Sequence, residues 1–171
     1  RAHRDAADGA VSRRLLSALL TVFVVFLSLG VQEAADAKAP AQRLVIAQTG
    51  TNAHIVPVPV RNGRLMIGHS VSDVYTPKGG DPFCDPLGTS VIAGHTYRAG
   101  DGVADNWRTL KSGARIRVPG CTFKVTKVKV VSGKFRIGRL MRPDGPPRLI
   151  LIGCKPDDYS RRILVFAKMV G

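Results

Sequence analysis

The sequence predicts an all-β fold: a closed or nearly closed barrel of seven or eight strands with one or two short helices, preceded by an apolar N-terminal segment. Short apolar or alternating runs recur through most of the 171 residues, and 18 Gly and 11 Pro separate them. After the N-terminal segment, no apolar repeat of helical period extends beyond about two turns. Short strands joined by turns are typical of barrels, and this length suits one domain with a tail.

The N-terminal segment divides into a basic flank, an apolar run and a linker. Four arginines lie in residues 1–14, and residues 15–31 are uncharged. A helix over that run is about 25 Å long, close to a hydrocarbon core of roughly 30 Å. The basic flank predicts that residues 1–14 stay in the cytoplasm and that the chain after residue 31 is exported. Ala35-Asp36-Ala37 also fits a signal-peptide cleavage site, so two alternatives stay open. The protein is a single-pass protein of the cell membrane with an extracellular domain, or it is secreted.

Residues 32–42 predict a linker, and residues 43–171 predict the folded domain. The runs that predict strands are 44–47, 54–60, 64–68, 89–93, 115–118, 123–131, 135–137, 149–153 and 163–169. Asn62-Gly63 predicts a two-residue hairpin turn. The alternation in 123–131 changes phase near Thr126 and Lys127, which predicts a β-bulge.

Three other segments predict connections. Residues 70–88 include Gly79, Gly80, Pro82 and Pro86 and predict a long loop, and Ser132-Gly133 predicts a turn between two strands. A short helix is expected from Asp105 to Lys111, with Asp105 or Asn106 as its N-cap and with Trp107 and Leu110 on one face.

The charge is strongly positive and belongs to the predicted domain. The chain has 26 Lys and Arg against 12 Asp and Glu, a net of +14. Residues 1–39 hold 5 basic and 4 acidic side chains, so residues 40–171 carry 21 against 8, a net of +13. Nucleic acid is an unfavoured partner, because the domain is predicted to be exported and only 6% of residues are aromatic. Anionic lipids and wall polymers suit the charge better.

Three residues at predicted strand ends could act together in one reaction at a carbonyl group. His95 follows the apolar run 91–94, Cys154 follows 149–153, and Arg162 begins the apolar run 163–167. A thiolate is a nucleophile, a histidine can protonate a leaving amine, and an arginine can stabilise an oxyanion. Lys155, Arg161 and Arg162 would together favour the thiolate of Cys154. His54 and His69 are expected to be surface histidines, and His3 lies on the cytoplasmic flank.

These residues resemble those of the sortases. The resemblance rests on Val91-Ile92-Ala93-Gly94-His95, on residues 107–113, and on Leu149 to Cys154 followed by Arg162 to Ala167, and it covers the chain from about Leu44 onward. It implies a membrane-anchored cysteine transpeptidase of Gram-positive bacteria with a barrel of eight strands. It also implies substrates: surface proteins with a Leu-Pro-x-Thr-Gly-like sorting motif, cut between Thr and Gly, and an amine acceptor of the cell wall or a pilin.

The resemblance implies that His95, Cys154 and Arg162 are the catalytic residues, with Arg161 as the alternative if the register shifts by one. Gly153 departs from the family pattern, which has threonine before the cysteine, so the help of that hydroxyl is absent. Other hypotheses are an L,D-transpeptidase, whose Ser-His-Gly-Cys-x-Arg run is missing here, another exported cysteine peptidase, or a basic wall-binding module without catalysis.

The remaining cysteines leave two alternatives. Cys84 and Cys121 both lie in predicted turns, and outside the membrane they form a disulfide or remain two separate thiols. Histidines and cysteines do not cluster at metal-ligand spacings, and no Gly-rich phosphate loop occurs, so we expect neither a metal nor a cofactor. Some sortases bind calcium through acidic loops, but the eight carboxylates of residues 40–171 are all Asp, and we expect no calcium dependence.

Overall fold

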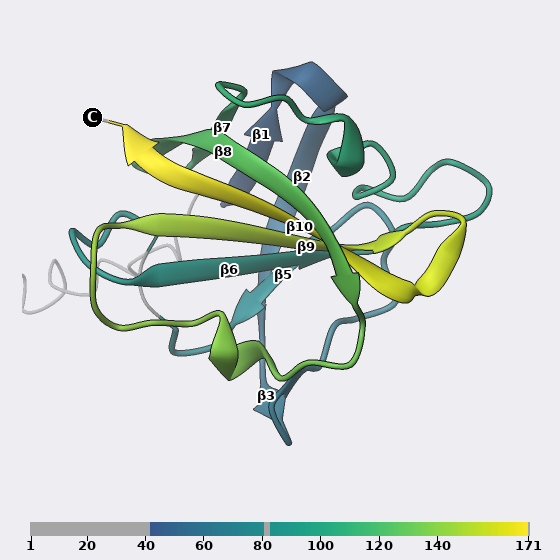
Figure 1. The fold of residues 1–171 in the computed structure, drawn as a ribbon, viewed down its shortest axis with the longest axis horizontal. Helices are drawn as coiled ribbons and strands as arrows, with labels where there is room; N and C mark the ends of the chain where they lie inside the picture. Colours follow the sequence, from purple (N-terminus) through teal and green to yellow (C-terminus); the bar gives the residue numbers. More distant parts are fainter. Residues whose placement is uncertain (1–41, 81–82, 171) are drawn as a thin grey trace, which may run out of the picture. The chain divides into compact units, whose positions relative to one another are not determined.

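The barrel is closed by eight strands in the computed structural model, which describes residues 42–80 and 83–170. Around the barrel the strands are β1 (Arg43–Ile46), β2 (Thr51–Val58), β5 (Val74–Pro77), β6 (Thr89–Gly94), β9 (Arg148–Lys155), β10 (Asp158–Val170), β8 (Cys121–Ser132) and β7 (Arg115–Val118), and β7 returns to β1 (Figure 1). The pairs β2–β5 and β6–β9 are parallel, and the others are antiparallel. The all-β barrel prediction is confirmed.

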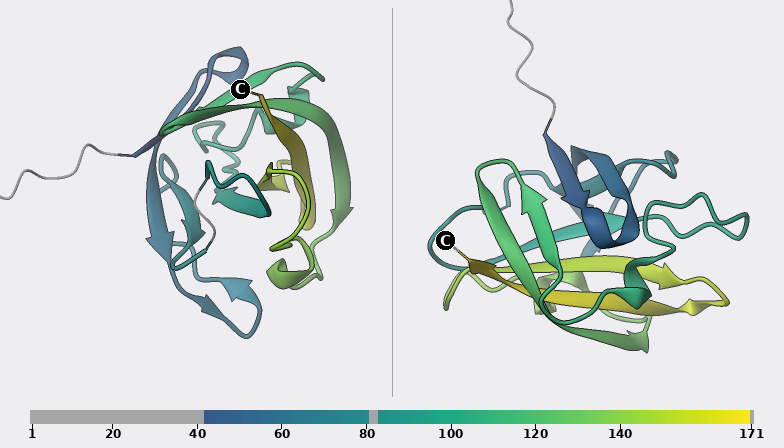
Figure 2. Two further views of the ribbon diagram at one scale, coloured as in Figure 1. Left: turned by 90° about the vertical axis from the view of Figure 1, so that its left-hand side faces the viewer. Right: turned by 90° about the horizontal axis from the view of Figure 1, so that it is seen from above.

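Along each strand the side chains point alternately into and out of this barrel, and those that point inward are mostly apolar. Figure 2 shows the strands curving round the enclosed core. Ile92 of β6, Leu151 of β9 and Ile163 of β10 are each 0% exposed and belong to one core cluster with Trp107 and Phe123. Residues two apart on a strand share a face, so on each of these strands the residues that alternate with the core residues point outward.

The described residues contain three short 3-10 helices instead of a longer α-helix. These are η1 (Ala47–Thr49), η2 (Trp107–Thr109) and η3 (Ile137–Arg139). The helix predicted from Asp105 to Lys111 shortens to η2, because the Asp105 carboxylate accepts hydrogen bonds from the backbone N–H groups of Tyr97 (2.8 Å) and Gly102 (2.9 Å) instead of capping a helix. Trp107 and Leu110, which were predicted to share one face, are both buried.

Two predicted connections are corrected. The loop expected over 70–88 contains β5, whose Val74 and Tyr75 are buried and pair with β2 and β6. Four residues without polar alternation, flanked by Ser, Gly and Pro, gave no strand signal. The strand expected over 135–137 is absent, since Ile137 begins η3, so Ser132-Gly133 does not join two strands; the Gly133 N–H donates to the Ser160 carbonyl instead (2.8 Å).

Two local predictions are confirmed. β3 (Val60–Arg61) and β4 (Arg64–Leu65) form a hairpin around Asn62 and Gly63, whose φ angles of 51° and 71° are those of a type I′ turn. The bulge lies at Thr126, because Phe166 pairs with Lys127 and Ala167 pairs with Val125. The skipped Thr126 hydroxyl donates to the Phe166 carbonyl (3.0 Å).

Cys84 and Cys121 form a disulfide, with their Cα atoms 5.7 Å apart. The bond ties the loop before β6 to the first residue of β8, across 37 residues of sequence. The paired alternative is therefore correct, and Cys154 is the free cysteine of the described ranges.

The predicted anchor or signal, residues 15–31, lies outside the described residues. Among the residues that are described, no helix has the length and apolar character needed to span a membrane.

Candidate active site

The ends of three neighbouring strands bring the predicted site residues together. In the antiparallel pair β9–β10, Cys154 is directly opposite Arg162. In the parallel pair β6–β9, Ala93 is opposite Ile152, and continuing that register by two residues places His95 beside Cys154. Opposite residues on adjacent strands share a face. His95, Cys154 and Arg162 therefore lie side by side on the outer face, because Ile92, Leu151 and Ile163 occupy the inner one.

Hydrogen bonding fixes the backbone of Cys154. Its carbonyl accepts a bond from the Thr96 hydroxyl (2.8 Å), which holds the chain just after β6 against β9. The thiol is half-buried. The preceding Gly153 has no room for a side chain, since a Cβ there would lie 2.9 Å from Ala104 Cβ and 3.5 Å from Thr96 Oγ1. The packing of Ala104 thus explains the glycine, and a threonine hydroxyl from the neighbouring strand end lies close to the same place.

Arg162 is held by backbone carbonyls. Its Nη1 donates to the carbonyls of Tyr159 (2.6 Å) and Arg161 (3.1 Å), and the group lies so close to Gly133 that a Cβ there would be 2.9 Å from Nη1. Arg161 is exposed and is opposite Ser132 of β8, with no partner on β9. The register thus brings Arg162, not Arg161, opposite the thiol.

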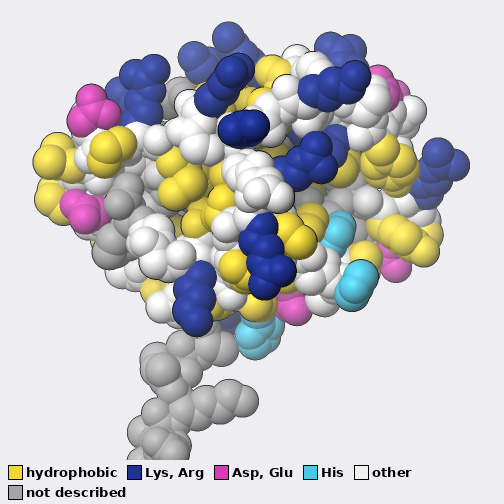
Figure 3. Space-filling view, turned by 90° about the horizontal axis from the view of Figure 1, so that it is seen from below, with side chains coloured by type: hydrophobic (Ala, Val, Ile, Leu, Met, Phe, Trp, Pro, Cys, Tyr) yellow, Lys and Arg dark blue, Asp and Glu magenta, His cyan; other side chains and the backbone are white. Residues whose placement is uncertain are grey.

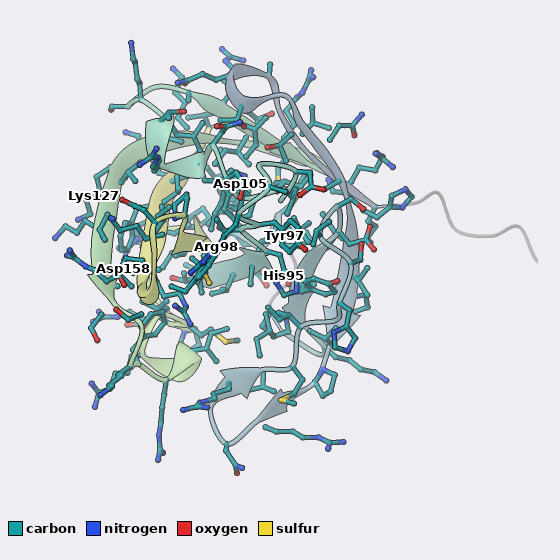
Figure 4. The ribbon with its side chains drawn as sticks, turned by 90° about the vertical axis from the view of Figure 1, so that its right-hand side faces the viewer. His95, Tyr97, Arg98, Asp105, Lys127 and Asp158 are labelled. Atoms are coloured by element: carbon teal, nitrogen blue, oxygen red, sulfur yellow. A yellow bond between two sulfur atoms is a disulfide. The ribbon has the colours of Figure 1, made fainter. Side chains whose placement is uncertain are left out.

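His95 is oriented from the segment that leads into β5. Its Nε2 lies 2.6 Å from the Gly68 carbonyl oxygen, and because a carbonyl only accepts, Nε2 carries the proton. The rings of Tyr75 and His95 lie edge to face, with their centroids 5.9 Å apart. Burial, and to a smaller extent the negative charge of Asp73, raise the pKa of Tyr75, whose hydroxyl donates to the Ser70 carbonyl (3.0 Å). Figure 4 looks onto this end of the barrel, where His95 and Arg98 lie.

The turn between β9 and β10 carries the acidic groups nearest to the site in sequence. Lys155 Nζ lies 2.7 Å from the Asp157 carboxylate, and the hydrogen bond from Lys155 lowers the pKa of Asp157. A hydrogen bond from Ser160 likewise lowers the pKa of Asp158. Lys155 is thus paired with Asp157, whereas Arg162 is the cation directly opposite Cys154.

An apolar cleft adjoins these residues. Its volume is about 300 Å³, and its floor includes Ala93, Ile152 and Arg162, on the outer face of β6, β9 and β10. Its walls come from the β3–β4 hairpin, from Ile67 just beyond it, and from the segment after β8. The apolar wall residues are Leu65, Ile67, Phe135 and Ile137. Sequence reasoning missed this cleft, because it assigned the walls to strands of the sheet.

Other candidates take no part in this arrangement. His54 and His69 are exposed, as predicted. Within residues 42–80 and 83–170, no three His, Cys, Asp or Glu side chains gather as metal ligands would.

The fold is a closed all-β barrel in which a free cysteine is opposite an arginine at the ends of two neighbouring strands, and comparison with known proteins identifies its family. The model of the sortase domain matches residues 44–170, so the chain belongs to the sortase family, a family of cysteine transpeptidases. No curated protein matches the chain.

Solved sortases share the fold. Sortase C-1 from Actinomyces oris is 25% identical, with a TM-score of 0.62, over 77% of this chain and 75% of that one. Sortase A from Listeria monocytogenes is 15% identical, with a TM-score of 0.61, over 77% of this chain and 87% of that one. Sortase A from Corynebacterium diphtheriae is 21% identical, with a TM-score of 0.58, over 77% of this chain and 60% of that one. The last two show similarity of fold alone.

Proposed function

We propose that this chain is an extracytoplasmic sortase that cuts a Leu-Pro-x-Thr-Gly-like motif between Thr and Gly and transfers the acyl part to an amine of the cell wall or a pilin. The observation that carries the proposal is the shared outer face of His95, Cys154 and Arg162 beside an apolar cleft. The predicted N-terminal helix would anchor the enzyme in the membrane or direct its secretion.

The first half-reaction divides among the three side chains. The Cys154 thiolate attacks the carbonyl carbon of the motif threonine, and a C–S bond forms. The carbonyl oxygen becomes an oxyanion, which the Arg162 guanidinium stabilises by charge and hydrogen bonding. The C–N bond to glycine then breaks, and protonated His95 gives its proton to the leaving amine. A thioester to Cys154 remains.

The second half-reaction reverses these roles. The acceptor amine attacks the thioester carbon and loses a proton to His95. The C–S bond breaks, and the thiolate of Cys154 is restored opposite Arg162. The apolar cleft suits the leucine and proline of the motif, because its walls are aliphatic and aromatic. The Thr96 hydroxyl, bonded to the Cys154 carbonyl, keeps the nucleophile's backbone in place throughout.

Cleavage by the full chain and by Cys154→Ala tests the proposal. A quenched fluorescent Leu-Pro-x-Thr-Gly peptide library, with mass spectrometry of the products, is expected to show scission between Thr and Gly and transfer to an added amine. Cys154→Ala is expected to remove both activities with an unchanged unfolding transition. Cleavage that persists in this variant would refute the thioester mechanism, and a wild-type chain that cleaves no peptide would favour a binding module.

His95→Ala has a matched control in His54→Ala, because His54 is an exposed histidine on β2. Loss of activity in the first variant alone supports the proton-transfer role. Equal activity in both variants contradicts it.

A further inference from the structure

A second, larger cavity adjoins the apolar cleft and is lined by cations. Its volume is about 840 Å³, and its charged lining residues are Arg61, Arg64, Lys134, Arg136 and Arg139. All five side chains are exposed, and no Asp or Glu lines the cavity. Four of the five are arginines, whose planar guanidinium groups bind carboxylates in bidentate fashion. We call this cavity the basic groove.

Two chain segments held against each other build the basic groove. The tip of the β3–β4 hairpin contacts the segment after β8, since Ile137 N–H donates to the Gly63 carbonyl (2.9 Å). The stem of Arg136 packs against Gly63, where a Cβ would lie 3.1 Å from it. Gly63 has a φ of 71°, so both the turn and this close approach require glycine. The cations are therefore carried by two segments that are fixed against each other at this turn.

These cations have no carboxylate partners among the described residues. In that part of the chain the ion pair found is Lys155 with Asp157, at the turn between β9 and β10. Figure 3 views the face from below and shows Lys and Arg side chains around apolar ones. Like charges placed together without counter-ions repel one another, and an anionic ligand relieves that repulsion.

We propose that the basic groove binds acidic side chains of the substrate protein in the segment that precedes its sorting motif. This inference rests on the proposed function and extends it to substrate selection. The groove joins the apolar cleft at Arg64, Gly133 and Phe135, which line both. An acidic segment next to the motif would be held there while the motif occupies the cleft.

The positions of the apolar cleft and the basic groove relative to Cys154 determine the direction in which the bound peptide runs. The cleft floor includes Ala93 and Ile152, two residues before His95 and Cys154 on their strands. A peptide with its scissile carbonyl at Cys154 and its apolar residues in the cleft reaches the basic groove with the residues before the motif. The acceptor amine attacks from the side vacated by the leaving glycine, so the acceptor does not approach the thioester through the basic groove.

Matched peptides test this inference. Three peptides share one Leu-Pro-x-Thr-Gly-like core that the enzyme cleaves and differ in four preceding residues, which are acidic, neutral or basic. The full chain is expected to show a kcat/KM about tenfold higher for the acidic than for the neutral peptide at low salt, as expected for a few exposed ion pairs. The preference is expected to shrink to less than about twofold in 0.5 M salt, because salt screens exposed charges.

Variants locate the preference. Arg61→Glu/Arg139→Glu is expected to reverse it, so that the basic peptide is cleaved faster than the acidic one. Arg115→Glu/Arg117→Glu is the matched control, because these are two exposed arginines on β7 that do not line the basic groove. The control is expected to keep the acidic preference. The inference is overturned if the wild type cleaves acidic and neutral peptides at equal rates. It is also overturned if Arg61→Glu/Arg139→Glu still prefers the acidic peptide.

Binding separates this inference from the proposed function. Fluorescence anisotropy with Cys154→Ala measures peptide affinity without turnover. Tighter binding of the acidic peptide that depends on Arg61 and Arg139 supports the groove even where no peptide is cleaved, and only the transpeptidase proposal then fails. Equal binding of all three peptides overturns the groove. Arginine-dependent binding to phosphatidylglycerol vesicles without any peptide preference also overturns it, because the groove is then a membrane contact.

Discussion

The inner and outer faces of β6, β9 and β10 use the same strands for different purposes. On the inner face, Ile92, Leu151 and Ile163 are completely buried in the barrel core. On the outer face, Ala93, Ile152 and Arg162 line a cleft instead of meeting a second packed layer, and Cys154 is paired with Arg162. The core fixes the strands, and the strand register then fixes the spacing of the reactive groups.

The outer face stays partly open because its covering is sparse. The β3–β4 hairpin and the segment after β8 cross it with few apolar residues, and the small Ala93 leaves room beneath them. No second packed layer fills this face, and the cleft of about 300 Å³ beside the three site residues is space that a ligand could occupy. Substitutions on the two faces are therefore expected to affect different measurements.

The largest effect separates the two neighbouring arginines of β10. Arg162→Ala is expected to lower kcat by about 10²- to 10³-fold, the loss typical of removing one oxyanion-stabilising group. Arg161→Ala is expected to stay within a few-fold of wild type, because Arg161 is exposed and is opposite Ser132 instead of Cys154. Single-turnover kinetics of thioester formation measure both. A larger loss of kcat in Arg161→Ala than in Arg162→Ala would assign the oxyanion-stabilising role to Arg161 and would contradict the β9–β10 register described above.

The next effect contrasts adjacent residues of β9. Leu151→Ala is expected to lower the free energy of unfolding by about 3 kcal/mol, because it leaves a cavity in the core. Ile152→Ala is expected to cost less stability but to raise KM, because Ile152 lines the cleft. Urea unfolding and peptide kinetics on both variants check this. If Ile152→Ala proves as destabilising as Leu151→Ala and leaves KM unchanged, the outer face is a second core and not a binding surface.

The inner face is the part of the fold that the sequence predicted well. Runs such as 149–153 and 163–169 contain enough apolar residues to identify buried strands, although β10 begins five residues earlier, at Asp158. The bulge at Thr126 was predictable for the same reason, because a change in alternation is visible in one strand. β5 was missed, since four residues without alternation carry too little periodicity and its pairing with β2 comes from tertiary contacts.

The outer face was predictable only in part. His95, Cys154 and Arg162 were identified from their places at strand ends, but no pattern in the sequence states that β6, β9 and β10 are neighbours. Phe135 and Ile137 suggested a strand, because their alternation is the same whether they pair in a sheet or cover a cleft. The basic groove also depends on contacts between segments some 70 residues apart, such as Gly63 with Ile137, which local patterns cannot specify.

The smallest expected effect concerns Tyr75, which lies between the core and the site. Tyr75 is 3% exposed, and its hydroxyl donates to the Ser70 carbonyl. Tyr75→Phe keeps the aromatic ring beside His95 and removes the hydrogen bond, so we expect a loss of about 1 kcal/mol in unfolding free energy at neutral pH with activity retained.

The pH dependence of that loss tests its cause. Burial raises the pKa of Tyr75 above its ordinary value near 10. The stability that this group contributes is therefore complete below about pH 10 and is lost as the pH rises through the raised pKa, because the ionised phenolate is less favourable in the fold than in the unfolded chain. The difference between wild type and Tyr75→Phe is expected to shrink above pH 10 in urea unfolding. A difference that stays constant to pH 11 would mean that the Tyr75 hydroxyl is not held in a buried, neutral state, and that the His95 side of the site is more open than the inner face beside it.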